Sequence, residues 1–256
     1  MEMLFGPEAL WIVSFCCLVA MVAGTVKGVV GFGMPMVLIS GLSTVMPPDL
    51  ALAGLILPTL ITNGWQALRQ GVAAAWESVR KYRVFLLVGL VFLLGSAQVV
   101  RAVPSQVLLL GIGVPIVAYA LTSLAGRPLR LPAGAGARTE AAIGAVAGFF
   151  GGISGVWGPP TVAMLSSRDT GKTEQMRVQG VIYGLGAVAL VVAHVSSGVL
   201  NRDTAPFSMI LIVPAMVGMW IGFRIQDRLD HATFRKLTFL VLFLAGANLV
   251  RRGLWG

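Results

Sequence analysis

Lys27 has the most unusual chemical setting in the sequence, because it stands in an apolar stretch beside Gly28. If that stretch crosses a membrane, a lysine charge near its centre costs about 2.5–3.5 kcal/mol on insertion scales. Such a charge is tolerated best beside a polar cavity or a counter-ion. The apolar setting of Lys27 therefore predicts an anion-binding site beside it. The alternative is a shallower lysine whose side chain reaches the lipid headgroups.

Two glycine-rich stretches are each followed by proline, a pattern typical of one helix ending and another beginning. The first has Gly28, Gly31 and Gly33 before Pro35, and the second has Gly151, Gly152, Gly155 and Gly158 before Pro159-Pro160. Proline is favoured in the first turn of a helix, so new helices are expected near Gly33 and Gly158. Each new N-terminus presents unpaired N–H groups, and two such ends could hold an anion. The alternative is a kinked transmembrane helix whose glycines allow close packing.

Polar side chains in two further apolar segments complete the candidate site. Thr62, Asn63 and Gln66 fall on one side of the segment 51–68, and Tyr183 and His194 lie in the segment 178–199. His194 also fits an ordinary structural role as a hydrogen-bonding side chain. The candidate substrate-binding residues are Lys27, Gly31, Phe32, Gly33, Asn63, Gln66, Gly155, Trp157, Gly158, Tyr183 and His194.

The predicted membrane interior contains neither acidic residues nor a catalytic motif. All ten acidic residues fall in loops or at segment ends, which argues against a cation site or a carboxylate proton relay. No nucleophile elbow, zinc-binding helix or metal cluster is present in the sequence. We therefore expect no cofactor, no metal and no enzymatic activity. The rival interpretation is an intramembrane serine hydrolase, in which Ser154 would pair with His194.

The composition determines the elements that must position these residues. Of 256 residues, 57% are hydrophobic and 11% are charged, and the mean hydropathy is +0.87. A soluble domain has about a quarter of its residues charged, so a cytosolic enzyme and a disordered protein are excluded. The net charge of +9 indicates basic membrane-flanking loops rather than a nucleic-acid partner, because no basic patch contains interleaved aromatic residues. The predicted fold class is an all-α, polytopic membrane protein.

The two halves of the chain resemble each other. A shift of 124 positions aligns residues 22–39 with 146–163 and gives six identities, including Gly28 with Gly152 and Pro35 with Pro159. We interpret this as an internal duplication. The predicted domains are a first membrane repeat at 1–124, a connecting loop at 125–140 and a second membrane repeat at 141–256. Apolar segments are predicted at 9–26, 29–46, 51–68, 84–100, 106–124, 141–165, 178–199, 205–223 and 237–252.

The distribution of basic residues favours a hairpin at each break. With both hairpins returning to their starting side, 14 of the 19 basic residues fall in the loops 69–83, 125–140, 166–177 and 224–236, which are then cytoplasmic. Each half becomes one hairpin plus three crossings, so the second half is inverted relative to the first, with both termini outside. Inverted repeats with broken helices are typical of secondary transporters.

The sequence resembles the sulfite exporter TauE/SafE family, also called the sulfonate-uptake permeases. The resemblance is found in Gly24 to Pro35, GTVKGVVGFGMP, and in Gly148 to Pro160, GFFGGISGVWGPP. It continues through Asn63 and Arg69-Gln70-Gly71, then Gly89, Gly95, His194 through Gly198, Gly218 and Gly222. The resemblance implies transport of small sulfur-containing or organic anions across the bacterial cytoplasmic membrane.

The expected function is therefore secondary transport of a small oxyanion (sulfite, sulfate or an organosulfonate) by alternating access at a midplane site between the two breaks. The open alternatives are transport of small organic carboxylates and, with less support, the intramembrane hydrolase. The expected partners are the anion and the lipid bilayer, with a proton or a sodium ion as the candidate coupling ion. The sequence leaves the oligomeric state open.

Overall fold

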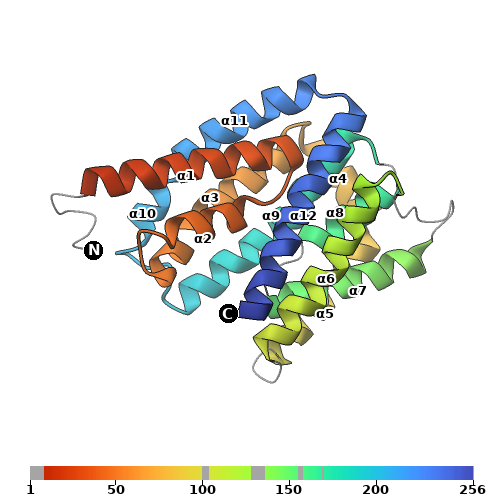
Figure 1. Ribbon diagram of the computed structural model, residues 1–256, viewed down its shortest axis with the longest axis horizontal. Helices are drawn as coiled ribbons and strands as arrows, with labels where there is room; N and C mark the ends of the chain where they lie inside the picture. Colours follow the sequence, from red (N-terminus) through yellow and green to blue (C-terminus); the bar gives the residue numbers. More distant parts are fainter. Residues whose placement is uncertain (1–8, 100–103, 128–135, 155–157, 169, 256) are drawn as a thin grey trace. The chain divides into compact units, whose positions relative to one another are not determined.

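The computed structural model describes residues 9–99, 104–127, 136–154, 158–168 and 170–255, and these residues form helices and their connections, with no strand. Figure 1 shows the helices along the chain. Their bounds are α1 Ala9–Val30, α2 Met34–Leu42, α3 Pro48–Leu68, α4 Val72–Lys81, α5 Arg83–Val99, α6 Ser105–Leu124, α7 Ala137–Ser154, α8 Gly158–Ser167, α9 Lys172–Ser196, α10 Ala205–Ile210, α11 Ile212–Arg228 and α12 His231–Trp255.

Several of these helices are long and apolar enough to cross a membrane, which confirms the predicted class of multi-pass membrane protein. Within the described ranges, five stretches meet this criterion: Leu10–Val30, Pro48–Leu68, Lys172–Ser196, Ala205–Arg228 and His231–Trp255. Two shorter apolar helical stretches, Arg83–Ser96 and Leu109–Leu124, join them. A span of about 20 residues matches the thickness of the bilayer core.

The first predicted break is confirmed, although it begins later than expected. α1 continues through Gly28 and ends at Val30, so the expectation that Gly28 interrupts the helix is wrong. Gly31 and Gly33 adopt φ values of 89° and 90°, which residues other than glycine rarely adopt. α2 then starts at Met34 with Pro35 in its first turn. In the second stretch, α7 ends at Ser154 and α8 starts at Gly158, while residues 155–157 lie outside the described part of the chain.

Two segments differ from the sequence prediction. The expected loop 69–83 contains α4, whose face with Ala75 and Ser78 is buried while Val72 and Trp76 are exposed. A search for long apolar runs overlooks such a short surface helix. Lys81, at its end, donates a hydrogen bond of 2.5 Å to Glu174, and this bond raises the pKa of Lys81. The expected segment 205–223 is divided into α10 and α11 at Leu211.

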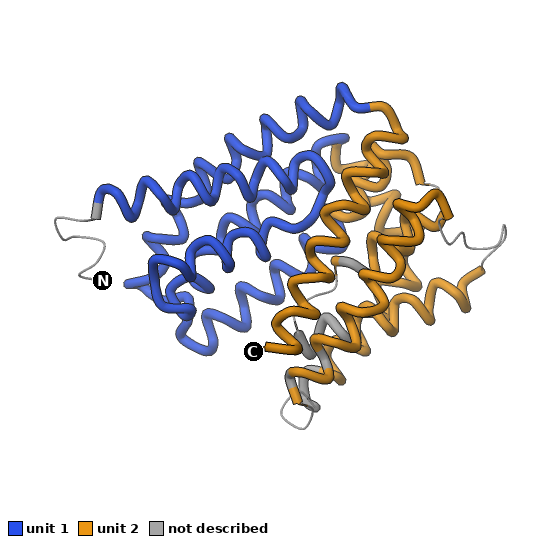
Figure 2. The backbone as a smooth tube through the Cα atoms, viewed as in Figure 1, with its two compact units in different colours: residues 1–70, 180–229 blue, residues 71–179, 230–256 orange. Residues whose placement is uncertain are grey.

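The chain forms two compact units, coloured separately in Figure 2. Unit 1 comprises residues 1–70 and 180–229, and unit 2 comprises residues 71–179 and 230–256. Each unit therefore takes helices from both halves of the sequence, and α9 contributes to both. The predicted repeats, 1–124 and 141–256, do not coincide with these two units. The boundaries of the repeats therefore remain a prediction.

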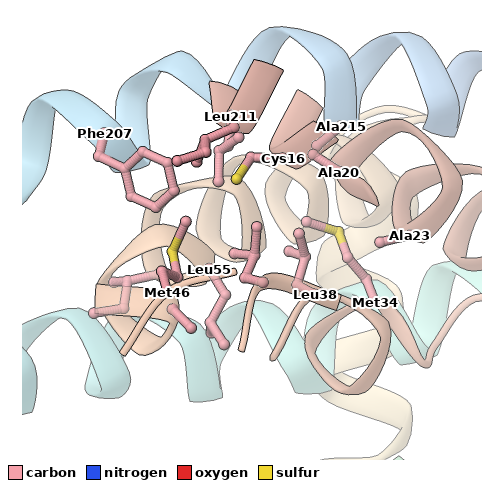
Figure 3. Close-up of a cluster of buried hydrophobic side chains, with 14 of the residues drawn as sticks. Cys16, Ala20, Ala23, Met34, Leu38, Met46, Leu55, Phe207, Leu211 and Ala215 are labelled. Carbon is pink, nitrogen blue, oxygen red and sulfur yellow. The ribbon is translucent and has the colours of Figure 1, made fainter. Parts of the chain in front are cut away.

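The core of unit 1 follows from an apolar stripe on α1. Ile12, Cys16, Ala20 and Ala23 recur at helical spacing and are all buried. Their buried partners, drawn in part in Figure 3, come from α2, α3, α10, α11 and the connections: Met34, Leu38, Leu42, Met46, Ala51, Leu55, Ile56, Leu200, Phe207, Leu211 and Ala215. The stripe fixes the face that α1 turns inward.

Glycines allow α1 to pack directly against the backbone of α11. A Cβ atom built at Gly222 would lie 2.7 Å from the Gly28 Cα, and one built at Gly218 would lie 2.7 Å from the Met21 carbonyl carbon. Small residues permit such close helix contacts in membranes, where packing replaces the hydrophobic effect as the driving force.

Unit 2 contains a similar glycine contact between α7 and α5. A Cβ atom built at Gly148 would lie 2.8 Å from the Gly89 Cα. α12 packs along α6, and α8 contacts α6, α7 and α12. Thus one helix of each broken pair packs on an unbroken helix through backbone-to-backbone contact.

A methyl group added at Gly222 is expected to destabilise unit 1, because it would meet backbone that cannot move aside. Gly222→Ala should lower the free energy of unfolding by about 1–3 kcal/mol, the usual cost of overpacking. Gly111→Ala in α6 is the matched control, since a Cβ there meets nothing within 4 Å. The control should be neutral or stabilising by about 0.5–1 kcal/mol. Thermal unfolding in detergent measures both, and equal stabilities would contradict the close packing.

Candidate functional site

Lys27 lies in the last turn of α1, on the same face as the apolar stripe, and only 2% of its surface is exposed. Its ammonium group, Nζ, donates a hydrogen bond to Oδ1 of Asn63 in α3. The side chain is therefore turned into unit 1, and the alternative of a lysine reaching for the lipid headgroups does not fit this placement. No carboxylate among the described residues forms an ion pair with it.

Asn63 is held in a defined orientation by a second partner. Its Nδ2 donates to the backbone carbonyl of Tyr183 in α9 at 3.2 Å. With the amide nitrogen turned to this carbonyl, the amide oxygen faces Lys27. Asn63 is 2% exposed and Tyr183 is 6% exposed, so this link between α1, α3 and α9 is buried.

α3 also contacts both sides of the break. Nε2 of Gln66 donates to the Gly31 carbonyl at 3.0 Å, and the Gly31 N–H donates to the Lys27 carbonyl at 2.7 Å. One turn earlier, the Thr62 hydroxyl donates to the Pro58 carbonyl at 2.6 Å, and its oxygen lies 3.4 Å from the Met34 sulfur. The side chains predicted to share one face of α3 thus hold the end of α1, the glycine break and the start of α2.

The structure brings most of the predicted residues of unit 1 together around the first break. These are Lys27, Gly31, Phe32, Gly33, Asn63, Gln66 and Tyr183, and each is less than a tenth exposed. His194 lies apart, because it follows Tyr183 by eleven positions in α9, about 16 Å along the helix. In unit 2, Gly158 is the first residue of α8. Gly155 and Trp157 fall outside the described residues.

Arg69 was not predicted as part of the site, yet it connects the ends of α3 and α11. Its guanidinium donates to Gln226 at 3.2 Å and to Asp227 at 2.5 Å, and it lies over the Phe223 ring at 4.1 Å. Trp65 packs edge-on against the same ring at 5.2 Å. Arg69 belongs to one of the motifs of the family resemblance, but nothing in the sequence indicates its distant partner Asp227.

The chemistry of this cluster suits an anion. Lys27 is the one basic residue with less than a tenth of its surface exposed among those the structure describes. The other buried polar groups of unit 1 are amides and hydroxyls, namely Thr59, Thr62, Asn63, Gln66, Ser208 and Gln226. Such a set supplies a positive charge and hydrogen-bond donors, whereas a cation site in a membrane normally includes a carboxylate.

A comparison with protein families identifies the chain by its sequence. Residues 16–249 match the family described as sulfite exporter TauE/SafE. The chain belongs to this family. Neither the curated proteins nor the solved structures include a significant match. Membership confirms the resemblance, and it implies a membrane transporter of sulfite- or sulfonate-type anions, in agreement with the apolar helices and the buried lysine of this TauE/SafE protein.

The contact between Arg69 and Asp227 is expected to stabilise unit 1 slightly, because both side chains are partly exposed, at 29% and 56%. Exposed pairs are worth about 0.2–1 kcal/mol. Asp227→Arg should lower the unfolding temperature by placing two positive charges together. Adding Arg69→Asp should restore part of the loss, but not the stacking on Phe223. A double-mutant cycle by thermal unfolding measures the coupling, and strictly additive effects would contradict it.

Proposed function

We propose that this TauE/SafE protein is a secondary transporter of a small oxyanion, such as sulfite, sulfate or an organosulfonate, in the bacterial cytoplasmic membrane. The observation behind this proposal is the buried ammonium of Lys27, which lies beside a glycine break without a carboxylate partner among the described residues. Burying a charge without a counter-charge is costly, so an anion that binds beside Lys27 relieves that cost. Family membership supports transport over the hydrolase alternative.

Backbone donors are proposed to assist Lys27. α2 begins directly after the break, at Met34, and its N-terminus favours negative charge. Gly31 and Gly33 have no side chains, so an anion can approach the backbone closely. From the repeat in the sequence, we propose that the start of α8 at Gly158 offers backbone donors of the same kind in unit 2.

We further propose that transport proceeds by alternating access between inverted repeats, at 1–124 and 141–256, joined by the loop 125–140. The aligned stretches 22–39 and 146–163 pair α1 with α7. The order of the later apolar segments pairs 84–100 with 205–223, and so α5 with α11. α1 packs on α11 in unit 1, and α7 packs on α5 in unit 2. This exchange of equivalent partners supports the duplication, and the distribution of basic loops supports the inversion.

Lys27→Met should impair anion flux much more than folding, since a charge-assisted hydrogen bond is worth about 1.5–3 kcal/mol. Affinity should fall roughly tenfold to a hundredfold. The measurement is flux into proteoliposomes with sulfite, sulfate, thiosulfate, sulfoacetate and lactate, the last testing for organic carboxylates. The matched control is Lys236→Met, because Lys236 is an exposed lysine in α12.

Two results would contradict this assignment. Cation flux without anion flux would exclude an anion transporter. Equal losses in the Lys27 and Lys236 variants would show that Lys27 does not serve the substrate. Repeating the flux measurement with an imposed proton or sodium gradient identifies the coupling ion.

The inverted topology makes a separate prediction about loop accessibility. In a Cys16→Ala/Cys17→Ala background, Asp203→Cys should react with an impermeant maleimide from the outside, because the loop before α10 is proposed to be external. Glu77→Cys in α4 should react only from the cytoplasmic side. Both positions are exposed. Labelling of both from the same side would reject the inverted arrangement.

A further inference from the structure

The balance of charge around Lys27 bears on the kind of anion that the site accepts. Of the acidic residues in the described part of the chain, Glu140, Glu174 and Asp227 form ion pairs, and their partners are Arg168, Lys81 and Arg69. Lys27 is 2% exposed and has an amide as its partner. The buried cluster of Lys27, Asn63, Gln66 and Tyr183 therefore contains one formal positive charge and no formal negative charge.

Asn63 binds the ammonium without cancelling its charge. Asparagine and aspartate have the same shape, but the amide oxygen is a neutral acceptor, whereas a carboxylate would form a buried ion pair with Lys27. The bond from Nδ2 of Asn63 to the Tyr183 carbonyl requires the amide, because a carboxylate has no N–H to donate there. This second bond favours asparagine over aspartate at position 63.

The ammonium also retains donors that the protein does not use. A lysine ammonium has three N–H groups. Among the described residues, Asn63 is the one side-chain acceptor that Nζ of Lys27 contacts. Two N–H groups of a side chain that is almost fully buried thus remain for the oxygen atoms of a ligand.

One buried positive charge balances one negative charge. A monoanion beside Lys27 would make the cluster neutral, whereas a dianion would leave a net negative charge in an environment of low dielectric constant, where an unbalanced charge is costly. From this geometry we infer that the site selects singly charged oxyanions, such as a sulfonate or hydrogensulfite, over dianions, and that Asn63 maintains this selectivity by leaving the charge of Lys27 available. This inference rests on the proposed anion transport.

The first test compares two anions that both present oxygen atoms bonded to sulfur but differ in charge. Methanesulfonate is a monoanion and sulfate is a dianion at neutral pH. Binding to the purified full-length protein, measured by titration calorimetry, should be at least tenfold tighter for methanesulfonate. Equal affinities, or tighter binding of sulfate, would overturn the inference and leave anion transport standing. Absence of binding and of flux for every anion would instead overturn the proposed function.

The second test gives Lys27 a permanent counter-charge. Asn63→Asp should reduce methanesulfonate affinity at least tenfold, because the ammonium would then be paired within the protein. The matched control is Asn201→Asp, an equally small change at an exposed asparagine of unit 1, and it should leave binding unchanged. Full methanesulfonate affinity in a folded Asn63→Asp variant would overturn the inference. If that variant does not fold, the comparison of the two probes on the unmodified protein decides the question alone.

Discussion

A positive charge enclosed in apolar protein needs polar partners, and at Lys27 this requirement governs the surrounding part of unit 1. The inward face of α1 is apolar from Ile12 to Ala23, and Lys27 continues that face. α3 must therefore change from apolar to polar at the same depth. It does so at Thr62, Asn63 and Gln66, within the last two turns before its end at Leu68. An apolar α3 would leave the ammonium without any acceptor, at a cost of several kcal/mol.

The glycine break and the close helix packing both shape the surroundings of Lys27, in different ways. A helix that ends inside the protein leaves backbone carbonyls without helical partners, and Gln66 satisfies the carbonyl of Gly31. The contact of α1 with the backbone of α11, through Gly24, Gly28, Gly218 and Gly222, holds α1 directly against α11. Lys27 thus lies on a closely packed helix, three residues before that helix ends at Val30. For the proposed anion transport, this close packing would keep the charge of Lys27 at a fixed position.

Features that depend on residue type and local order could be predicted from the sequence. The glycines Gly31 and Gly33 before Pro35 indicate the end of α1 and the start of α2. The anion position at Lys27 stays a prediction. The helical spacing of Thr62 and Gln66 places both on the face that meets the break. Features that depend on distant contacts could not be predicted. The Tyr183 carbonyl that orients Asn63 lies 120 positions away, and Asp227 lies 158 positions from Arg69. α4 was not predicted, because its apolar face is too short to resemble a membrane-spanning helix.

The predicted duplication pairs several glycines of the two halves, but it does not pair Lys27 with a second charge. The shift of 124 positions that pairs Gly28 with Gly152 and Pro35 with Pro159 pairs Lys27 with Gly151. Each half therefore contains a glycine break and a new helix, while the first half alone contains a lysine at this position. Backbone donors at helix N-termini carry partial positive charge, and both halves contain such a helix start. A full charge would have been doubled by a faithful duplication, and two lysines would then favour a dianion. The single lysine thus distinguishes the two halves, and in the proposed anion site it is the residue that sets the charge of the ligand.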